Sequence, residues 1–337
     1  MFNKIKNLFG VPSVSTQAKI VRVSGDKAYS VTLENRSSKW PSRGPRNRIE
    51  PLCLPTLNPQ HVIDSSNQIF TIGSCFARNI ELALKAANFN VPSADVRFPE
   101  EELWQGTKLH SGLLNKYTPQ SMLNELEYVF DNKYTADDFL IEVGNDEYID
   151  LQLHSNQYVT FQRGLQRRAE IKDSIKQFVN SADVIIVTLG LVEVWWDSKN
   201  KIYLNEAPSK KLVEKHKGRF YFETMSPECV FDNVAKIIKL LKGNSKDNSW
   251  IMLTVSPVPL ARTFRDKDVI IANMYSKSLL RVAAEIESDK NDFVEYFPSY
   301  ESVMLSDRQK LWKDDQIHLE YEAIKKITER VVQKYSA

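Results

Sequence analysis

Short apolar runs alternate with amphipathic stretches along most of the chain from residue 68 onward. Runs such as DVIIVT at 183–188 and WIMLTV at 250–255 each contain four consecutive apolar residues, which is typical of strands buried on both faces of a parallel sheet. The pattern predicts strands at 68–73, 183–188, 250–255 and 293–296, and helices at 76–88, 120–130, 165–180, 226–241, 271–287 and 319–334. This alternation predicts an α/β domain whose central parallel sheet is covered by helices on both faces.

Three segments depart from the alternation. In residues 1–60, apolar and polar positions alternate at 20–23 and 28–33 around Ser24-Gly25-Asp26-Lys27, which predicts an N-terminal β-hairpin, and a Pro/Arg-rich extended connector follows at 40–59. We therefore expect an appendage over residues 1–60 and one α/β domain over 61–337. The pattern over residues 134–158 predicts an inserted hairpin around Gly144. Residues 198–222 show no clear periodicity, and we interpret them as a second insertion. Long insertions of this kind often build the walls of a site.

The composition is that of a soluble globular protein, with 42% hydrophobic and 26% charged residues. No window predicts a transmembrane span, and the first residues do not resemble a signal peptide. Three cysteines without disulfide or zinc spacing indicate a reducing, cytoplasmic setting and no metal site. Residues 1–50 carry a net charge of +7, and the remainder carries −5. We interpret the basic segment first as a solvated edge of the protein, and second as a region in weak contact with an anionic membrane surface. Basic and aromatic residues do not interleave, so we expect no nucleic-acid partner.

The segment IFTIGSCFA at 69–77 is the most informative part of the sequence. It passes from an apolar strand through a glycine and a serine into a helix that starts near Cys75. A nucleophile at such an elbow lies at the mouth of a parallel sheet. The positive end of the following helix favours a thiolate at Cys75.

The segment DDQIH at 314–318 supplies a candidate base. Asp315, three residues before His318 on a turn, would fix the imidazole tautomer so that the other ring nitrogen takes the proton of a nucleophile. Capping of the last helix is the commoner role for such an aspartate. A cysteine at an elbow elsewhere in the chain favours the catalytic interpretation.

Two further segments place polar or small residues where strands end. TLGLVEVW at 188–195 follows a buried strand, so Glu193 would orient a base, contact substrate or hold a loop through backbone amides. Trp195, with Trp196 and Tyr221, would stack on a sugar ring or simply pack. Gly112, in a loop before Asn115 and Tyr117, would pair its amide with that of Cys75 as an oxyanion hole.

These residues carry a resemblance to a known family. The segments GSCFA at 73–77, TLGLVEVW at 188–195, TVSPVP at 254–259, SKSLLR at 276–281, EYFPSYE at 295–301 and DDQIH at 314–318 resemble the GSCFA family of the SGNH/GDSL hydrolase superfamily, over roughly residues 50–325. The resemblance implies a flavodoxin-like three-layer α/β/α sandwich. It also implies a nucleophile at Cys75, an Asp315–His318 pair, and oxyanion or substrate-binding roles for Ser74, Gly112, Gly190, Glu193 and Trp195.

One position departs from the superfamily pattern. Val192 stands where an asparagine would supply a side-chain amide, so one oxyanion donor is missing or comes from elsewhere. The superfamily mostly cleaves or transfers acyl groups on sugars, lipids and polysaccharides, which implies a substrate carrying an acyl ester, such as a bacterial glycan. The sequence shows no phosphate loop or coenzyme A signature, so we expect no bound cofactor, and an acyl-CoA donor is an analogy only.

Three hypotheses stay open from the sequence. The first is an esterase or O-acyltransferase that uses Cys75, His318 and Asp315. In the second, Ser74 is the nucleophile and Cys75 is a small buried hydrophobe. In the third, the fold is a glycan- or lipid-binding module without chemistry.

Overall fold

The computed structural model describes residues 22–45, 47–104 and 110–336. Its contacts divide the chain into two units, Met1–Asn47 and Arg48–Ala337. The expected connector at 40–59 therefore falls partly in the second unit. Its residues there are fastened by hydrogen bonds, from the Cys53 amide to Ser306 Oγ at 2.6 Å and from Arg330 to the Pro55 carbonyl at 2.7 Å.

The described part of the first unit contains one helix, α1, at Gly25–Glu34. The predicted hairpin is therefore wrong at 23–33, and positions 20 and 21 lie outside the described residues. Ser24 caps α1 by accepting a hydrogen bond from the Lys27 amide, and Asp26 lies in the first turn. The residues interpreted as a hairpin turn are thus a helix start, because Ser and Asp serve both purposes.

The second unit is built on a four-stranded parallel sheet of order β1-β4-β8-β9. Its strands are β1 (Ile69–Gly73), β4 (Val184–Leu189), β8 (Trp250–Val255) and β9 (Val294–Tyr296). Thr188 pairs with Gly73 on one side and Thr254 on the other, so the carboxyl ends of β1, β4 and β8 meet at one edge. The predicted strands are confirmed to within a residue or two.

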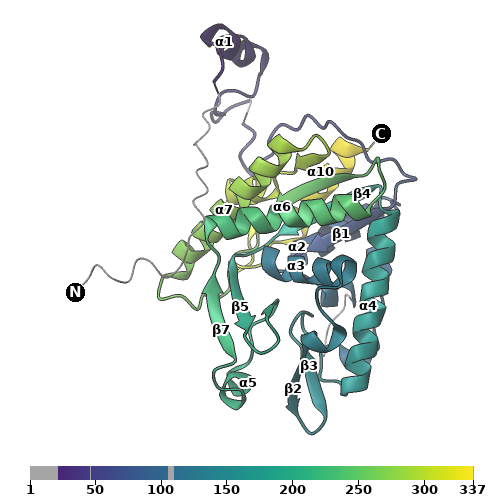
Figure 1. Ribbon diagram of the computed structural model, residues 1–337. Coiled ribbons are helices and arrows are strands. Elements are labelled where there is room, and N and C mark those ends of the chain that lie inside the picture. Colours follow the sequence, from purple (N-terminus) through teal and green to yellow (C-terminus); the bar gives the residue numbers. More distant parts are fainter. Residues whose placement is uncertain (1–21, 46, 105–109, 337) are drawn as a thin grey trace, which may run out of the picture. The chain divides into compact units, whose positions relative to one another are not determined.

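Helices cover both faces of this sheet, as Figure 1 shows. Alternate residues of each strand enter two separate cores: Ile185 and Val187 of β4 belong to one, and Val184 and Ile186 to the other. The first core holds α4 (Phe161–Ser181), α6 (Pro227–Asn244) and α7 (Val269–Lys290), while the second holds α2 (Cys75–Ala86) and α10 (Tyr321–Tyr335). The expected three-layer α/β/α sandwich is confirmed.

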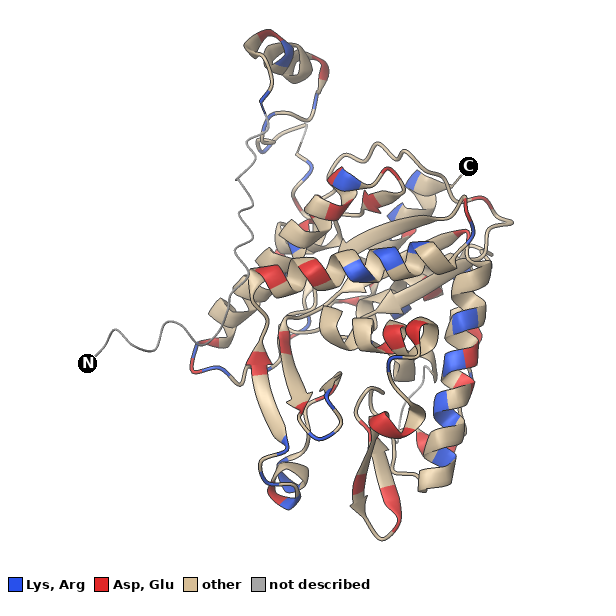
Figure 2. Ribbon diagram, viewed as in Figure 1, with Lys and Arg blue, Asp and Glu red and all other residues tan. Residues whose placement is uncertain are grey.

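The remaining elements surround this sandwich. Helix α3 (Pro119–Leu126) ends in a π-helical turn at Glu127–Asp131, so the helix predicted at 120–130 changes type near its end. The short helices α8 (Ser299–Met304) and α9 (Arg308–Leu311) precede the turn before α10. In Figure 2, α6 shows Asp and Glu in its amino-terminal half and Lys in its carboxyl-terminal half, which complements the helix dipole. No helix in the described ranges is long and apolar enough to cross a membrane.

Both insertions form small sheets. Strands β2 (Leu140–Gly144) and β3 (Glu147–Asp150) form the predicted hairpin around Gly144. The insertion at 198–222 contributes β6 (Ile202–Leu204), the helix α5 (Lys210–Lys215) and β7 (Phe220–Thr224), and the two strands flank β5 (Glu193–Asp197). Its strands are too short for a clear period, which is why the sequence pattern did not define them.

A buried charge network fastens the β2–β3 hairpin to the main domain. Arg168 of α4 pairs with Asp150 of β3 and, at 2.8 Å, with Glu125 of α3, which also pairs with Lys116 at 2.8 Å. All four side chains are buried. Burial acts to raise the pKa of Glu125, but Arg168 and Lys116 outweigh it and hold the pKa at about 2. The Lys116 amide donates to the Gly73 carbonyl at 2.8 Å, so the network reaches the end of β1.

Candidate active site

The elbow between β1 and α2 is fixed by close backbone contacts. Gly73 has φ +143°, and a Cβ added there would lie 2.3 Å from the Thr188 carbonyl oxygen. Only glycine allows β1 to approach the end of β4 in this way. The chain then enters α2 directly, with Ser74 as N-cap and Cys75 as the first helical residue.

Burial dominates the electrostatics of Cys75. It raises the pKa of the thiol, although Lys277, the backbone N–H groups of Cys75 and Phe76, and Arg78 act in the opposite direction. The N–H groups at the helix start favour a thiolate, as expected, but burial outweighs them. A protonated thiol needs a base at the moment of attack.

The Asp315–His318 turn supplies an oriented imidazole. His318 Nδ1 lies 2.7 Å from Asp315 Oδ2, and the amides of Ile317 and His318 donate to Asp315 Oδ1 at 2.9 Å each. The hydrogen bond from the His318 ring, followed by those from the two amides, lowers the pKa of Asp315. An ionised carboxylate only accepts, so Nδ1 carries the proton and Nε2 presents its lone pair. Asp315 thus both holds the turn and orients the ring.

Cys75 and His318 line the same two cavities, although 243 positions separate them in the chain. The smaller cavity, of about 310 Å³, has mainly apolar walls that include Leu191, Val258, Pro259, Ala261 and Ile317. The larger, of about 480 Å³, is more polar and includes Arg78, Asn79, Asn115 and His154. No hydrogen bond joins Cys75 Sγ to the His318 ring in the described structure.

Ser74 and the two candidate glycines also lie at these cavities. Ser74 lines the smaller one but is 3% exposed, and its Oγ has no hydrogen-bond partner. Gly112 lines the larger cavity, and Arg78 Nη1 donates to the neighbouring Ser111 carbonyl at 3.4 Å. Gly190 lines the smaller cavity, where a Cβ would lie 2.4 Å from the Tyr117 carbonyl oxygen. Position 190 therefore requires glycine on steric grounds, whether or not the Gly190 amide contacts substrate.

Glu193 and Trp195 lie elsewhere. Both line a separate cavity of about 130 Å³ that does not include Cys75 or His318. Glu193 accepts from Thr263 Oγ1 at 2.8 and 3.0 Å and from the Phe264 amide at 3.4 Å. Trp195 packs against the rings of Phe222 and Phe264. Of the roles considered for Glu193, holding a loop is the one that these contacts support.

The sequence did not single out Lys277 of α7. Its ammonium is fully buried and donates to the Gly190 carbonyl at 2.8 Å, while the adjacent Ser276 Oγ accepts from the Val192 amide at 3.0 Å. Burial lowers the pKa of Lys277 to about 7, and Cys75 acts to raise it. The two residues hold the turn after β4 and place a cation near Cys75. A lysine within an amphipathic helical pattern gave no signal of this role.

Asn115 and Tyr117 were also not assigned roles from the sequence. Val192 is fully buried in the core and has no side-chain amide to offer. Asn115 lines the larger cavity beside Cys75, is 3% exposed, and its Oδ1 has no hydrogen-bond partner. Tyr117 lines the smaller cavity, and Cys75 contributes to raising the pKa of its phenol, after the larger effect of burial. In the sequence, the only indication of a role for Asn115 and Tyr117 was that they follow Gly112 by three and five residues.

A comparison with known protein families matches residues 68–331 to the GSCFA family. The chain belongs to the GSCFA family. No curated protein matches it. Within the five residues that give the family its name, Gly73, Ser74, Phe76 and Ala77 are buried and only Cys75 is partly exposed. The GSCFA match ends at 331 and so includes His318, Asp315 and Lys277 as well as the elbow.

Proposed function

We propose that this GSCFA protein is an acyl-transfer enzyme of the SGNH type, an esterase or O-acyltransferase, with Cys75 as nucleophile. The observation that carries the proposal is that Cys75 and the Asp315-oriented His318 line the same two cavities. A nucleophile and an oriented base facing one space form the minimal apparatus of acyl transfer.

The proposed first half-reaction starts from a protonated thiol. His318 Nε2 takes the thiol proton as Cys75 Sγ forms a bond to the carbonyl carbon of an ester or thioester. The bond to the leaving group then breaks, and His318 returns the proton to the departing oxygen or sulfur. The product is an acyl-thioester on Cys75 and a free alcohol or thiol. Water or a second alcohol attacks the thioester in the second half-reaction and regenerates the thiol.

The surroundings of Cys75 supply candidates for the other roles. The apolar walls of the smaller cavity suit a short acyl group such as acetyl. The Gly112 amide and the Asn115 side chain, both at the larger cavity, are candidate donors to the oxyanion in place of the side-chain amide that Val192 lacks. The substrate class we favour is an acyl ester of a glycan, with acyl-CoA as a second donor. Three free cysteines fit a reducing compartment, so we place the reaction in the cytoplasm.

Turnover of an aryl acetate tests the proposal. We expect Cys75→Ala and His318→Ala to lose at least about 10³-fold in kcat/KM, since nucleophile and base act as a unit. Cys229→Ala is the matched control because Cys229 is a free, partly buried cysteine outside both cavities. Intact mass after rapid quenching should show an acyl adduct that Cys75→Ala abolishes and Cys229→Ala retains. Unimpaired turnover by Cys75→Ala would refute the proposal.

A second candidate keeps the site but uses Ser74. The unpartnered Ser74 Oγ at the smaller cavity favours it, and its burial opposes it. Ser74→Ala distinguishes the two candidate nucleophiles. If Ser74→Ala loses the acyl adduct and Cys75→Ala retains it, Ser74 is the nucleophile. A glycan-binding module without chemistry is favoured by the raised Cys75 pKa and the buried Val192. It predicts saturable glycan binding and no turnover of any ester by the wild type.

A further inference from the structure

A second histidine–carboxylate pair faces the larger cavity. His154 Nδ1 is hydrogen-bonded to Glu206, and the ring lines the cavity that also contains Cys75 and His318. The His154 side chain is 34% exposed, so the ring is half-buried but reachable. As at Asp315, the carboxylate only accepts, so Nδ1 carries the proton of the neutral ring and His154 Nε2 has the lone pair.

The backbone holds this pair in place from several directions. The His154 amide donates to the Leu113 carbonyl at 3.0 Å, one residue from Gly112, and the Glu206 amide donates to the Leu151 carbonyl at 2.9 Å. The centroids of the His154 and Tyr117 rings lie 5.3 Å apart in a T-shaped arrangement. The next residue, Ser155, has φ +50°, a conformation that is costly for a non-glycine residue and is often found at functional sites.

Ser155 does not complete a separate nucleophile–base pair. Its Oγ lies 3.1 Å from His154 Nε2 and 3.4 Å from Nδ1. A hydroxyl in line with the Nε2 lone pair would be far from Nδ1, so nearly equal distances place Oγ off that line. The lone pair is therefore open to a group bound in the cavity.

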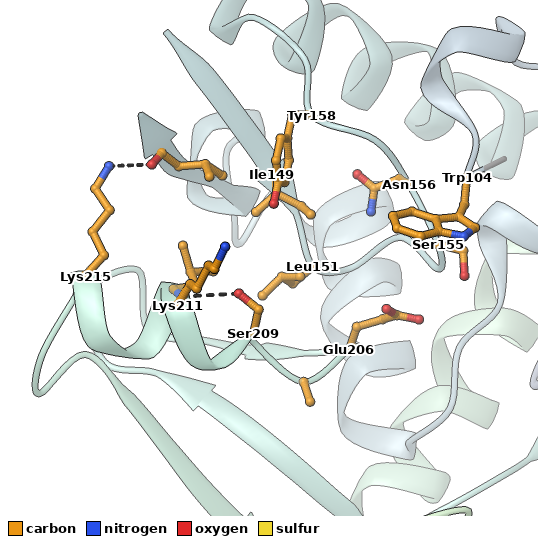
Figure 3. Close-up of a pocket in the computed structure, with 13 residues that line it drawn as sticks. Trp104, Ile149, Leu151, Ser155, Asn156, Tyr158, Glu206, Ser209, Lys211 and Lys215 are labelled. Carbon is orange, nitrogen blue, oxygen red and sulfur yellow. Dashed lines mark hydrogen bonds between the residues drawn. The ribbon is translucent and has the colours of Figure 1, made fainter. Parts of the chain in front are cut away.

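An adjoining cleft begins where this pair lies. Ser155 lines both the larger cavity at Cys75 and a second cavity of about 480 Å³, which Glu206 also lines. Figure 3 shows this cleft between Trp104 and Glu206 on one side and Lys211 and Lys215 of α5 on the other.

Its walls combine aromatic, aliphatic and hydrogen-bonding groups. Trp104 is 61% exposed and Tyr158 49% exposed, although both are large aromatic residues. Ile149 and Leu151 add apolar surface, and Ser155 and Glu206 contribute a hydroxyl and a carboxylate. Exposed aromatic faces next to hydroxyl and carboxylate groups suit a hydroxylated ring, that is, a sugar.

We infer that the cleft of Figure 3 binds a sugar acceptor and that His154, oriented by Glu206, activates its hydroxyl for transfer of the acyl group from Cys75. This inference rests on the proposed function and makes the protein a transferase. The acceptor oxygen bonds to the thioester carbonyl carbon, its proton passes to His154 Nε2, and the carbon–sulfur bond breaks to release the Cys75 thiolate. His154 then returns its proton through solvent to that sulfur. Two nucleophiles, the thiol and the acceptor hydroxyl, thus have one base each.

The kinetic test separates the two half-reactions. With p-nitrophenyl acetate as donor and the methyl glycosides of glucose, galactose and N-acetylglucosamine as acceptors, we expect at least one glycoside to accelerate deacylation saturably. His154→Ala and Glu206→Gln should retain the burst of p-nitrophenol and lose transfer to the sugar, by about 10²-fold for His154→Ala. His61→Ala is the matched control, since His61 forms a similar pair with Glu295 away from these cavities. Transfer unchanged in His154→Ala would overturn the inference and leave the proposed function intact, whereas equal release of p-nitrophenol by the wild type and Cys75→Ala would overturn the proposed function.

A binding measurement tests the cleft without any turnover. The protein has five histidines, so ring resonances of labelled histidine in Cys75→Ala can be assigned by substitution. At least one glycoside should shift the His154 resonance and leave that of His61 in place. Trp104→Ala should weaken the binding about tenfold, whereas Tyr221→Ala, which removes an exposed aromatic outside the cleft, should not. Binding that does not perturb His154, or no binding of any of the three, would overturn the inference.

Discussion

The elbow at Cys75 and the turn at His318 are built by opposite means. Gly73, Ser74, Phe76 and Ala77 are buried, and Gly73 and the Ser74 amide contact Thr188 of β4, so Cys75 is positioned by the core of the molecule. His318 is 66% exposed and Asp315 46% exposed, and local hydrogen bonds within the turn orient the ring. The comparison teaches that the proposed nucleophile is tied to folding, whereas the proposed base can be altered with little effect on folding. Changes at the two places should therefore separate stability from activity.

The largest effect should follow from Gly73→Ala. The methyl group would meet the Thr188 carbonyl at 2.3 Å in a backbone conformation with φ +143°, so we expect a loss of about 3–5 kcal/mol in the free energy of unfolding. Urea denaturation measures it. Gly112→Ala is the control because nothing lies within 4 Å of its added Cβ, and its loss should stay below about 1 kcal/mol. Equal losses from the two variants would contradict the account of the elbow.

Asp315→Asn should lower activity and leave stability almost unchanged, the reverse of the effect expected at Gly73. The amide cannot hold the His318 tautomer as a carboxylate does, so aryl acetate turnover should fall by about 10²–10³-fold. The thermal midpoint should barely change, because both side chains are largely exposed. Asp314→Asn, the neighbouring aspartate that lines neither cavity with Cys75, is the control and should retain turnover. A large fall in the midpoint with intact turnover would assign Asp315 to folding alone.

Lys277→Met probes the buried cation beneath the elbow. The pKa of Lys277 is about 7 in the folded protein and returns to about 10 in the unfolded chain. Between these values the unfolded chain binds more protons, so Lys277 makes the wild type more stable as pH rises, by up to about 1.4 kcal/mol per pH unit. Denaturation of both proteins at pH 7, 8 and 9 should show that the free energy of unfolding of the wild type rises with pH relative to that of Lys277→Met. A constant difference would mean that Lys277 keeps an ordinary pKa.

The smallest effect concerns the reactivity of Cys75. Since burial raises the pKa of its thiol, alkylation by iodoacetamide should be slow at neutral pH and should accelerate at a higher pH than for an exposed thiol. Lys277→Met removes a nearby group that is cationic up to about pH 7, so it should slow alkylation at or below that pH by a few-fold. Mass spectrometry of the Cys75 peptide, with the Cys229 peptide as internal reference, measures the rates. Fast alkylation at pH 7 would instead indicate a resting thiolate.

Much of the fold was predictable because buried positions recur along the sequence with the period of a strand or a helix. β4 and β8 are apolar except for one threonine each, since their alternate residues enter two cores, and the predicted strands match them. The N-terminal hairpin was predicted wrongly because α1 has no buried residue, so nothing in its periodicity reports its structure. Ser24 and Asp26 suit both a turn and a helix start.

The candidate site was predictable only where local sequence determines local geometry. The elbow and the Asp315–His318 turn each depend on a few adjacent residues, and both could be identified. Lys277, Asn115 and His154 approach Cys75 through packing of distant segments, which a single sequence does not encode locally. Glu193 and Trp195 follow a strand end as expected, but the chain turns after Gly190 and carries them to another cavity.

The charge network of Lys116, Glu125, Arg168 and Asp150 has a consequence for engineering. A hairpin inserted into a domain is ordinarily the first candidate for deletion or for exchange between homologues. Here the excision of β2–β3 would remove Asp150 and leave Arg168 inside the protein short of one counter-charge. A shortened variant or chimera should therefore retain the hairpin together with α3 and α4, or replace all four charges at once by apolar residues of similar volume.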